Sequence, residues 1–441
     1  MKLKFTEISG GVLAPRGFVG GAVFCDIKRL GTGKGSNKGP KRDLAIIFSE
    51  VPATTAGMFT TNQVCAAPVK VSMKHVKRGT ARAVVVNSGN ANACTGDQGW
   101  LDAEAMTVLT ANQFGIWPED VLVASTGRIG VVMPMKNVQR GIRAAAQLVS
   151  ASQASAGAIA EAIMTSDTHP KQVAIKFKLG GKSVIVAGVC KGAGMIQPGM
   201  SANGKRPAAT PLHATMLCFV TTDAAIEAKT LQTCLEHSVA TSFNRITVDG
   251  DMSTNDTVVV LANGLAENDT ITARSRELAT FQAALDHVCL ALAQKIVRDG
   301  EGVTRFVTVR VNGAKTFADA DAASRAVANS ALVKTSWFGG DPNWGRIIDA
   351  LGYSPATIVE EKVDIGYSAP GATKILWSLK GGQPTKVTFK ELCRAVAAKE
   401  FDLHINLNLG KASALMYAAD LTEEYVEFNK GDVSDPTTLG G

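Results

Sequence analysis

Short apolar segments alternate with amphipathic segments along most of the chain. In the amino-terminal half, this pattern predicts strands at residues 83–87 and 121–125 and helices at residues 101–114 and 138–149. Two further strands are predicted at 173–178 and 183–189, joined by Leu-Gly-Gly-Lys at 179–182. Because glycines in a short connection favour a tight reversal, these two strands are expected to form a β-hairpin.

The carboxyl-terminal half continues in the same style. The pattern predicts strands at 257–262, 304–311, 362–367 and 403–407, and helices after Asp223 and at 274–297, 318–332 and 389–399. Hairpins mixed with amphipathic helices favour an α/β fold of layered sandwich type over a single doubly wound sheet. With 441 residues, 46% of them hydrophobic, the chain is long enough for two or three packed domains.

Composition and charge exclude several classes of protein. Lys and Arg number 46 against 39 Asp and Glu, but the excess is spread along the chain and aromatics are only 6%, which argues against nucleic-acid binding. No apolar run has the length needed to cross a membrane, and the amino terminus lacks the apolar core of a signal peptide. The 8 cysteines and 6 histidines form no metal-binding spacing, so we expect no metal and reduced thiols in the cytoplasm.

The segment 213–220 carries the most specific chemical signal. Thr215 follows the small residue Ala214 and stands at the head of an apolar strand. If the bond between them is cut, the α-amine of Thr215, with an ordinary pKa of about 7.7–8.0, is placed to act as general base for its own hydroxyl. An Ala-Thr step at a strand start is also ordinary β structure, so this step alone does not identify a nucleophile.

Other residues at the ends of predicted elements offer matching chemistry. Thr126 and Gly127 follow a strand, where a hydroxyl and a backbone N–H are suited to stabilise an oxyanion, although a plain turn has the same composition. Lys191 also follows a strand and is either a solvated lysine or a partner for a substrate carboxylate. Glu301 lies between two glycines that fit a helix C-cap, and its carboxylate is suited to bind an ammonium group.

An ordered set of segments resembles one known family over nearly the whole chain. The segments are 11–18, 58–62, 87–96, 125–127, 164–168, 191–196, 214–223, 248–257, 299–304, 338–347 and 420–422. In this number and order they resemble the glutamate N-acetyltransferase/ornithine acetyltransferase family. The resemblance implies a layered α/β/β/α sandwich that cuts itself between Ala214 and Thr215 into an α chain, 1–214, and a β chain, 215–441.

The same resemblance implies an activity and its residues. Thr215 takes acetyl from N-acetylornithine as an acyl-enzyme and passes it to glutamate in cyclic arginine biosynthesis, with Thr126 and Gly127 as the oxyanion hole. The resemblance implies no bound cofactor, acetyl-CoA as a second acetyl donor, and an assembly of two α and two β chains. The substrate-binding positions that it implies are Thr165, Lys191, Thr215, Glu301, Asn429 and Ser434.

Two segments depart from the family pattern. Residues 201–213 are inserted between Met200 and the cleavage site, and their Asn-Gly step and two prolines favour an irregular loop. The tail after Asn429 is also divergent, with Ser434 where the family has threonine.

The same residues also fit two rival functions. An autoprocessing aminopeptidase or amidase of the N-terminal-nucleophile type would use the same nucleophile and oxyanion hole but pass the acyl group to water. Lys191 and Glu301 favour an amino-acid acceptor instead, and a requirement for glutamate separates the two activities. A binding protein that retains the fold without catalysis would show neither cleavage nor an acetyl-enzyme.

Overall fold

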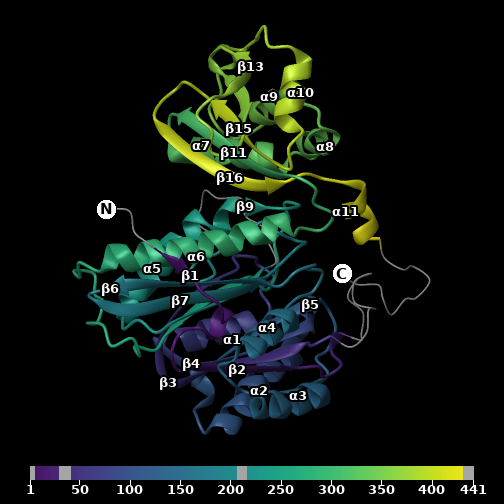
Figure 1. Cartoon of the computed structure of the whole chain (residues 1–441). Helices are drawn as coiled ribbons and strands as arrows, with labels where there is room; N and C mark the ends of the chain where they lie inside the picture. The colour runs from purple at the N-terminus through teal and green to yellow at the C-terminus, as the bar shows by residue number, and fades with distance from the viewer. Residues whose placement is uncertain (1–4, 29–40, 206–215, 431–441) are drawn as a thin grey trace.

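The computed structural model describes residues 5–28, 41–205 and 216–430. Within them the chain forms two lobes, drawn one above the other in Figure 1. The larger lobe is built on a sheet of nine described strands and the smaller lobe on a sheet of seven.

The strands of the larger sheet come from both halves of the sequence. Its order is β1-β6-β7-β8-β10-β3-β4-β5, with β2 paired to β3. The strands are β1 (Thr6–Glu7), β2 (Phe18–Val23), β3 (Leu44–Phe59), β4 (Thr80–Asn90), β5 (Val121–Arg128), β6 (Lys171–Leu179), β7 (Lys182–Lys191), β8 (Leu217–Thr222) and β10 (Thr257–Ala262). The predicted hairpin is confirmed, since β6 pairs with β7 in an antiparallel register that closes at Leu179 and Lys182.

The long strand β3 joins two layers of this sheet. Its first half pairs with β2 and its second half with β10, while β4 pairs along both halves across a shift in register. Side chains alternate between two cores along each strand: Leu217 and Phe219 enter a core between the layers, whereas Cys218 and Val220 enter an outer core. Strands buried on both faces explain the continuous apolar runs in the sequence.

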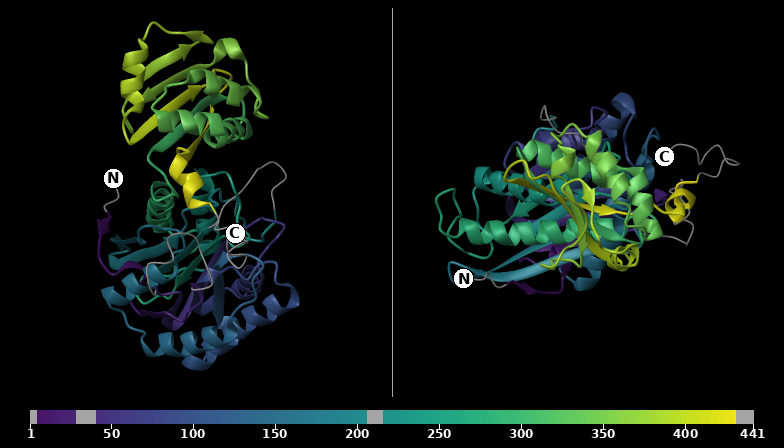
Figure 2. Two further views of the ribbon diagram at one scale, coloured as in Figure 1. Left: turned by 90° about the vertical axis from the view of Figure 1, so that its right-hand side faces the viewer. Right: turned by 90° about the horizontal axis from the view of Figure 1, so that it is seen from above.

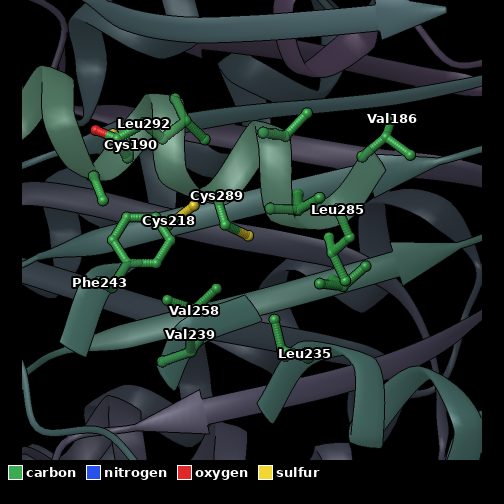
Figure 3. Close-up of a cluster of buried hydrophobic side chains, with 14 of the residues drawn as sticks. Val186, Cys190, Cys218, Leu235, Val239, Phe243, Val258, Leu285, Cys289 and Leu292 are labelled. Carbon is green, nitrogen blue, oxygen red and sulfur yellow. The ribbon is translucent and has the colours of Figure 1, made fainter. Parts of the chain in front are cut away.

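Helices cover the two outer faces. The helices of this lobe are α1 (Ala67–Val76), α2 (Gly96–Phe114), α3 (Met135–Gln147), α4 (Gln153–Ala162), α5 (Ala228–Thr241) and α6 (Leu278–Arg298). Helices α5 and α6 pack on β7, β8 and β10 through the core shown in Figure 3, and residues of α1, α2 and α3 share a core with β4 and β5. The predicted α/β/β/α sandwich is therefore confirmed, with an apolar core at each of its three layer boundaries.

The smaller lobe packs helices on one mixed sheet. Its strand order is β14-β13-β12-β15-β11-β16-β9, and the last of these, β9, comes from the part of the sequence that precedes β10. The strands are β9 (Ile246–Thr247), β11 (Phe306–Ala314), β12 (Asp364–Ser368), β13 (Leu376–Lys380), β14 (Gln383–Pro384), β15 (Glu400–Asn406) and β16 (Ala412–Ala419). The helices packed on it are α7 (Phe317–Asn329), α8 (Ala331–Gly339), α9 (Trp344–Gly352) and α10 (Phe389–Val396), and α11 (Glu423–Phe428) follows β16.

The last helix returns the chain to the larger lobe. After β16, helix α11 runs down beside the junction of the lobes, as both the front and the side views show (Figures 1 and 2). Thr422 caps α11 through the Tyr425 N–H and donates its own hydroxyl to the Gly302 carbonyl at 2.8 Å. The residues after β16 are therefore tied to the loop that follows α6.

Several predicted element boundaries differ from the structure. The helix expected over 318–332 is two helices, because α7 ends at Asn329 and the extended Ser330, whose hydroxyl accepts the Val333 N–H, starts α8. The helix expected from 274 begins at Leu278, and the one expected to 399 ends at Val396. Among the described residues, no helix is long and apolar enough to cross a membrane.

Candidate active site

Thr126 and Gly127 lie near the end of β5, where it runs parallel to β4. Gly127 is paired with Gly89 and has a φ of +132°, a conformation that residues with a side chain rarely adopt. A Cβ at Gly127 would stand 2.3 Å from the carbonyl carbon of Gly89. The close approach of the two backbones therefore requires glycine here, and it fixes the neighbouring Thr126, which is 1% exposed.

Lys191 connects Thr126 with the strand that follows the predicted cleavage site. It is the last residue of β7 and lies opposite Leu217 of β8, two positions after Thr215. Its Nζ donates a hydrogen bond to Thr126 Oγ1 at 3.2 Å. Because Lys191 Nζ is the donor in this bond, the Thr126 hydroxyl keeps its own proton available for another acceptor.

Burial dominates the electrostatics of Lys191. Its side chain is 2% exposed, and this loss of solvent lowers its pKa, although the Asp167 carboxylate opposes the effect. The Glu301 carboxylate also favours the ammonium form. Burial and the neighbouring carboxyl groups thus act on the pKa of Lys191 in opposite directions, and burial has the larger effect.

The start of β8 is fixed on both sides of Met216. The Met216 N–H donates to Asp256 Oδ1 at 2.6 Å, and the Met216 carbonyl accepts the Thr257 N–H at 3.1 Å. Asp256 is fully buried, which raises its pKa, and its Oδ2 has no hydrogen-bond partner among the described residues. Ala214 and Thr215 lie outside the described residues, and Met216 is the first described residue after them.

Thr165 is held by the carboxylate two residues after it. The half-buried Thr165 follows α4, and its N–H donates to Asp167 Oδ2 at 3.0 Å. The other oxygen of Asp167 accepts the Gly192 N–H at 2.7 Å. One carboxylate therefore joins the loop of Thr165 to the residue next to Lys191.

Glu301 and Asn429 meet from distant parts of the chain. Asn429 follows α11, and its Nδ2 donates to Glu301 Oε2 at 2.9 Å. The Glu301 carboxylate lies over Gly194, where an added Cβ would stand 2.5 Å from the carboxyl group. Ser434, the other predicted contact in the tail, lies outside the described residues.

The predicted site residues that the structure describes are joined either by direct hydrogen bonds or through one or two intervening residues. Lys191 and Thr126 touch directly, as do Glu301 and Asn429. Thr165 joins them through Asp167 and Gly192, and the Glu301 N–H donates to the Ala193 carbonyl at 2.9 Å. Within the described ranges, no group of three His, Cys, Asp or Glu side chains is placed to hold a metal ion.

Sequence reasoning missed four charged residues that support this site. Asp167, Asp256 and Asp299 all lie inside segments that carry the family resemblance, yet no function was assigned to them, and Lys171 lies outside those segments. The aspartates were recognisable only by their place in those segments. Lys171 gave no signal, because a lysine at the start of a strand is commonly solvated.

The family model and the sequence relatives agree on one family. The model of the ArgJ family matches residues 28–431. The arginine biosynthesis bifunctional protein ArgJ of Symbiobacterium thermophilum is 46% identical over 422 residues, which are 96% of this chain and 98% of that protein. The glutamate N-acetyltransferase of Methanocaldococcus jannaschii is 44% identical over 427 residues, again 96% and 98% of the two chains. A crystal structure of the Bacillus halodurans protein argJ is 42% identical with a TM-score of 0.45, and the match covers 48% of this chain and 97% of that one.

Proposed function

This chain belongs to the ArgJ family, and from that premise we propose that it is an acetyltransferase of arginine biosynthesis that moves acetyl from N-acetylornithine to glutamate. The observation that carries the proposal is the hydrogen bond from Lys191 to Thr126 beside the start of β8. This bond supports Thr126 as an oxyanion donor and Lys191 as a substrate contact, both next to the strand that begins two residues after Thr215.

The reaction starts with self-cleavage. Hydrolysis of the amide bond between Ala214 and Thr215 leaves a carboxylate on Ala214 and a free α-amine on Thr215. That amine takes the proton of the Thr215 hydroxyl as the oxygen attacks the acetyl carbonyl of N-acetylornithine. The Thr126 hydroxyl and the Gly127 N–H stabilise the oxyanion, and ornithine leaves with the proton on its amine.

The second half of the reaction reverses these steps with another amine. The amine of glutamate attacks the acetyl ester on Thr215, the same donors stabilise the oxyanion, and N-acetylglutamate is released. Dividing the exchange through an acyl-enzyme replaces one difficult transfer by two accessible ones.

The charged residues of the site fit amino-acid substrates. Lys191 supplies positive charge for a substrate carboxylate, and Glu301, whose described polar partner is the neutral Asn429, supplies negative charge for an ammonium group. Thr165 and Ser434 complete the set of proposed substrate contacts. The bifunctional name of the Symbiobacterium relative supports a second activity, in which acetyl-CoA donates acetyl to the same nucleophile and no cofactor is bound.

We further propose a cytoplasmic assembly of two α chains, 1–214, and two β chains, 215–441. All eight cysteines are free thiols, and five of them are buried, which supports a reducing compartment.

The nucleophile is tested with two variants. We expect wild-type protein and Thr215→Ser to separate into two fragments on denaturing electrophoresis, because both keep a hydroxyl, and Thr215→Ala to remain one chain. Intact mass spectrometry should place the cut between residues 214 and 215. An active wild-type protein that is never cut would contradict the mechanism.

The acceptor is tested with the cut wild-type enzyme. N-acetylornithine should be consumed only when glutamate is present, with N-acetylglutamate formed in equal amount. Replacing N-acetylornithine with acetyl-CoA tests the second donor. Release of acetate at the same rate without glutamate would identify a hydrolase instead.

A further inference from the structure

A buried lysine joins two aspartates beneath the proposed substrate site. The Lys171 Nζ lies 2.6 Å from Asp167 Oδ1 and also forms an ion pair with Asp299 Oδ2. The side chains of Lys171 and Asp167 are 2% and 0% exposed, and that of Asp299 is 11% exposed. We call these three residues the ion network.

The two carboxylates of the ion network hold different backbone segments. Asp167 accepts the N–H groups of Thr165 and Gly192, at 3.0 and 2.7 Å. Asp299 accepts the N–H groups of Thr168 and His169, at 3.1 and 3.3 Å. Asp167 and Asp299 therefore bind the two ends of the loop 165–169 by hydrogen bonds, and Asp167 also binds the turn after β7.

Asp299 also fixes the position of the loop that carries Glu301. It follows the last residue of α6, and its own N–H donates to the Lys295 carbonyl at 3.1 Å. Two residues later, the Glu301 N–H donates to the Ala193 carbonyl, next to the Gly192 that Asp167 holds. The segments that carry Thr165, Lys191 and Glu301 are thus all connected to Lys171 through Asp167 or Asp299.

The surroundings of Lys171 and Asp167 favour the charged form of each. Burial opposes the charge on Lys171, but Asp167 and Asp299 outweigh it and raise the pKa of the lysine. Burial likewise opposes ionisation of Asp167, but the two lysines Lys171 and Lys191 lower its pKa below the ordinary value. Removing Lys171 leaves the carboxylates of Asp167 and Asp299 without their shared counter-ion, so the loops that these carboxylates hold are destabilised or must shift.

We propose that Lys171, Asp167 and Asp299 are positioning residues that set the spacing between Lys191 and Glu301, and so the fit of the amino-acid substrate between its carboxylate and its ammonium group. This inference rests on the proposed function. A positioning role differs from a purely structural one in what a substitution changes. Loss of a contact that only stabilises the fold lowers the melting temperature without changing substrate affinity.

Two variants and a matched control test the proposal in the full-length, self-cleaved enzyme. Asp299→Asn removes one charge but leaves the pair between Lys171 and Asp167, and Lys171→Met removes the centre of the network. The control is Asp321→Asn, in a comparable buried cluster of the smaller lobe, where Asp321 pairs with Arg325 at 3.0 Å and with Arg245. For each we would measure the melting temperature, the extent of self-cleavage, and kcat and KM for N-acetylornithine with glutamate in excess.

The expected results separate positioning from stability. Asp299→Asn should raise KM on the order of tenfold with a smaller change in kcat, because it moves the Glu301 loop and leaves Lys191 on Thr126. Lys171→Met should raise KM further and also lower kcat. Asp321→Asn should lower the melting temperature while KM stays within about twofold of wild type.

The failures are distinguishable. A wild-type enzyme without glutamate-dependent transfer overturns the proposed function and the inference with it. Wild-type transfer, together with an unchanged KM in folded Asp299→Asn, overturns the inference alone. If Lys171→Met does not fold, Asp299→Asn decides the outcome.

Discussion

At the scale of single residues, the proposed oxyanion hole depends on how closely two strand ends approach. Gly127 faces Gly89 across the parallel pair of β4 and β5, and a Cβ at Gly127 would also lie 2.5 Å from the Asn90 nitrogen. Both obstacles are backbone atoms, which cannot rotate away as a side chain can. Any side chain at Gly127 must therefore separate the strands or displace the Gly127 N–H.

This argument predicts unequal effects for two glycine substitutions on the same segment. Gly127→Ala should lower kcat on the order of 100-fold, as for loss of one oxyanion donor, and should also lower the melting temperature. Gly130→Ala is the matched control, because Gly130 also has a positive φ, +79°, but a Cβ there meets nothing within 4 Å. It should cost only about 1–2 kcal/mol of unfolding free energy, with kcat nearly unchanged. Equal kcat values in the two variants would contradict a role for the Gly127 N–H.

Some residues of the site could be predicted from the sequence, and others could not for a physical reason. Thr126, Lys191 and Glu301 were identified because a hydroxyl, a cation and a carboxylate beside glycines suggest chemistry wherever they fold. Lys171 and Asp256 act through partners 128 and 40 positions away, Asp299 and Met216, and only the fold creates those pairs. Their function is therefore set by strand register and loop packing, which no local pattern encodes.

At the scale of elements, strand β8 is the part of the sandwich on which the chemistry depends. It lies between β7 and β10, and every described residue of β8 is buried. The residue before it, Met216, donates its N–H to Asp256 Oδ1, and Thr215 directly precedes Met216. The direction in which the chain enters the sheet is thus set by one buried carboxyl group.

Two substitutions at Asp256 should distinguish the role of its hydrogen-bond acceptor from the role of its charge. Burial raises the pKa of Asp256, so the fold favours the neutral carboxyl group, and Asp256→Asn should keep the acceptor for Met216 and cleave itself at nearly the wild-type rate. Asp256→Leu leaves the Met216 N–H without an acceptor, which should cost about 1–3 kcal/mol of unfolding free energy and slow self-cleavage. Denaturant unfolding and a time course of fragment formation measure both effects. Wild-type cleavage kinetics in Asp256→Leu would show that this contact does not position the scissile bond.

The same elements show how far the hydrophobic pattern predicts a fold. Strand β10 was predicted to the residue, and β6 and β7 to within two residues at each end, because apolar runs and a Gly-Gly turn are local signals. The 16-residue strand β3 was not predicted, since Pro52 and the polar residues within it interrupt the apolar pattern where pairing shifts register. The division of α7 from α8 was also missed, because helical periodicity continues across Ser330.

At the scale of the whole molecule, the predicted cleavage site does not separate two folding units. Residues before 214 supply β3 and β7, and residues after 215 supply β8 and β10 between them. Six residue pairs join β7 to β8, and six join β3 to β10. The core between the layers and the outer core beneath α5 and α6 both contain residues from each side of the cut.

The cut protein should therefore remain one particle. Separating the proposed α chain from the proposed β chain would expose the two faces and both edges of the inner strands, so hydrophobic burial and ladder hydrogen bonds oppose dissociation. We expect the two fragments to co-elute in size-exclusion chromatography under native conditions, at the volume of uncut Thr215→Ala, and to unfold in one cooperative transition. They should separate only in denaturant. Elution of the α chain alone in native buffer would show that the sheet does not hold the halves together, and it would require the catalytic residues of 1–214 and 215–441 to meet by reversible association.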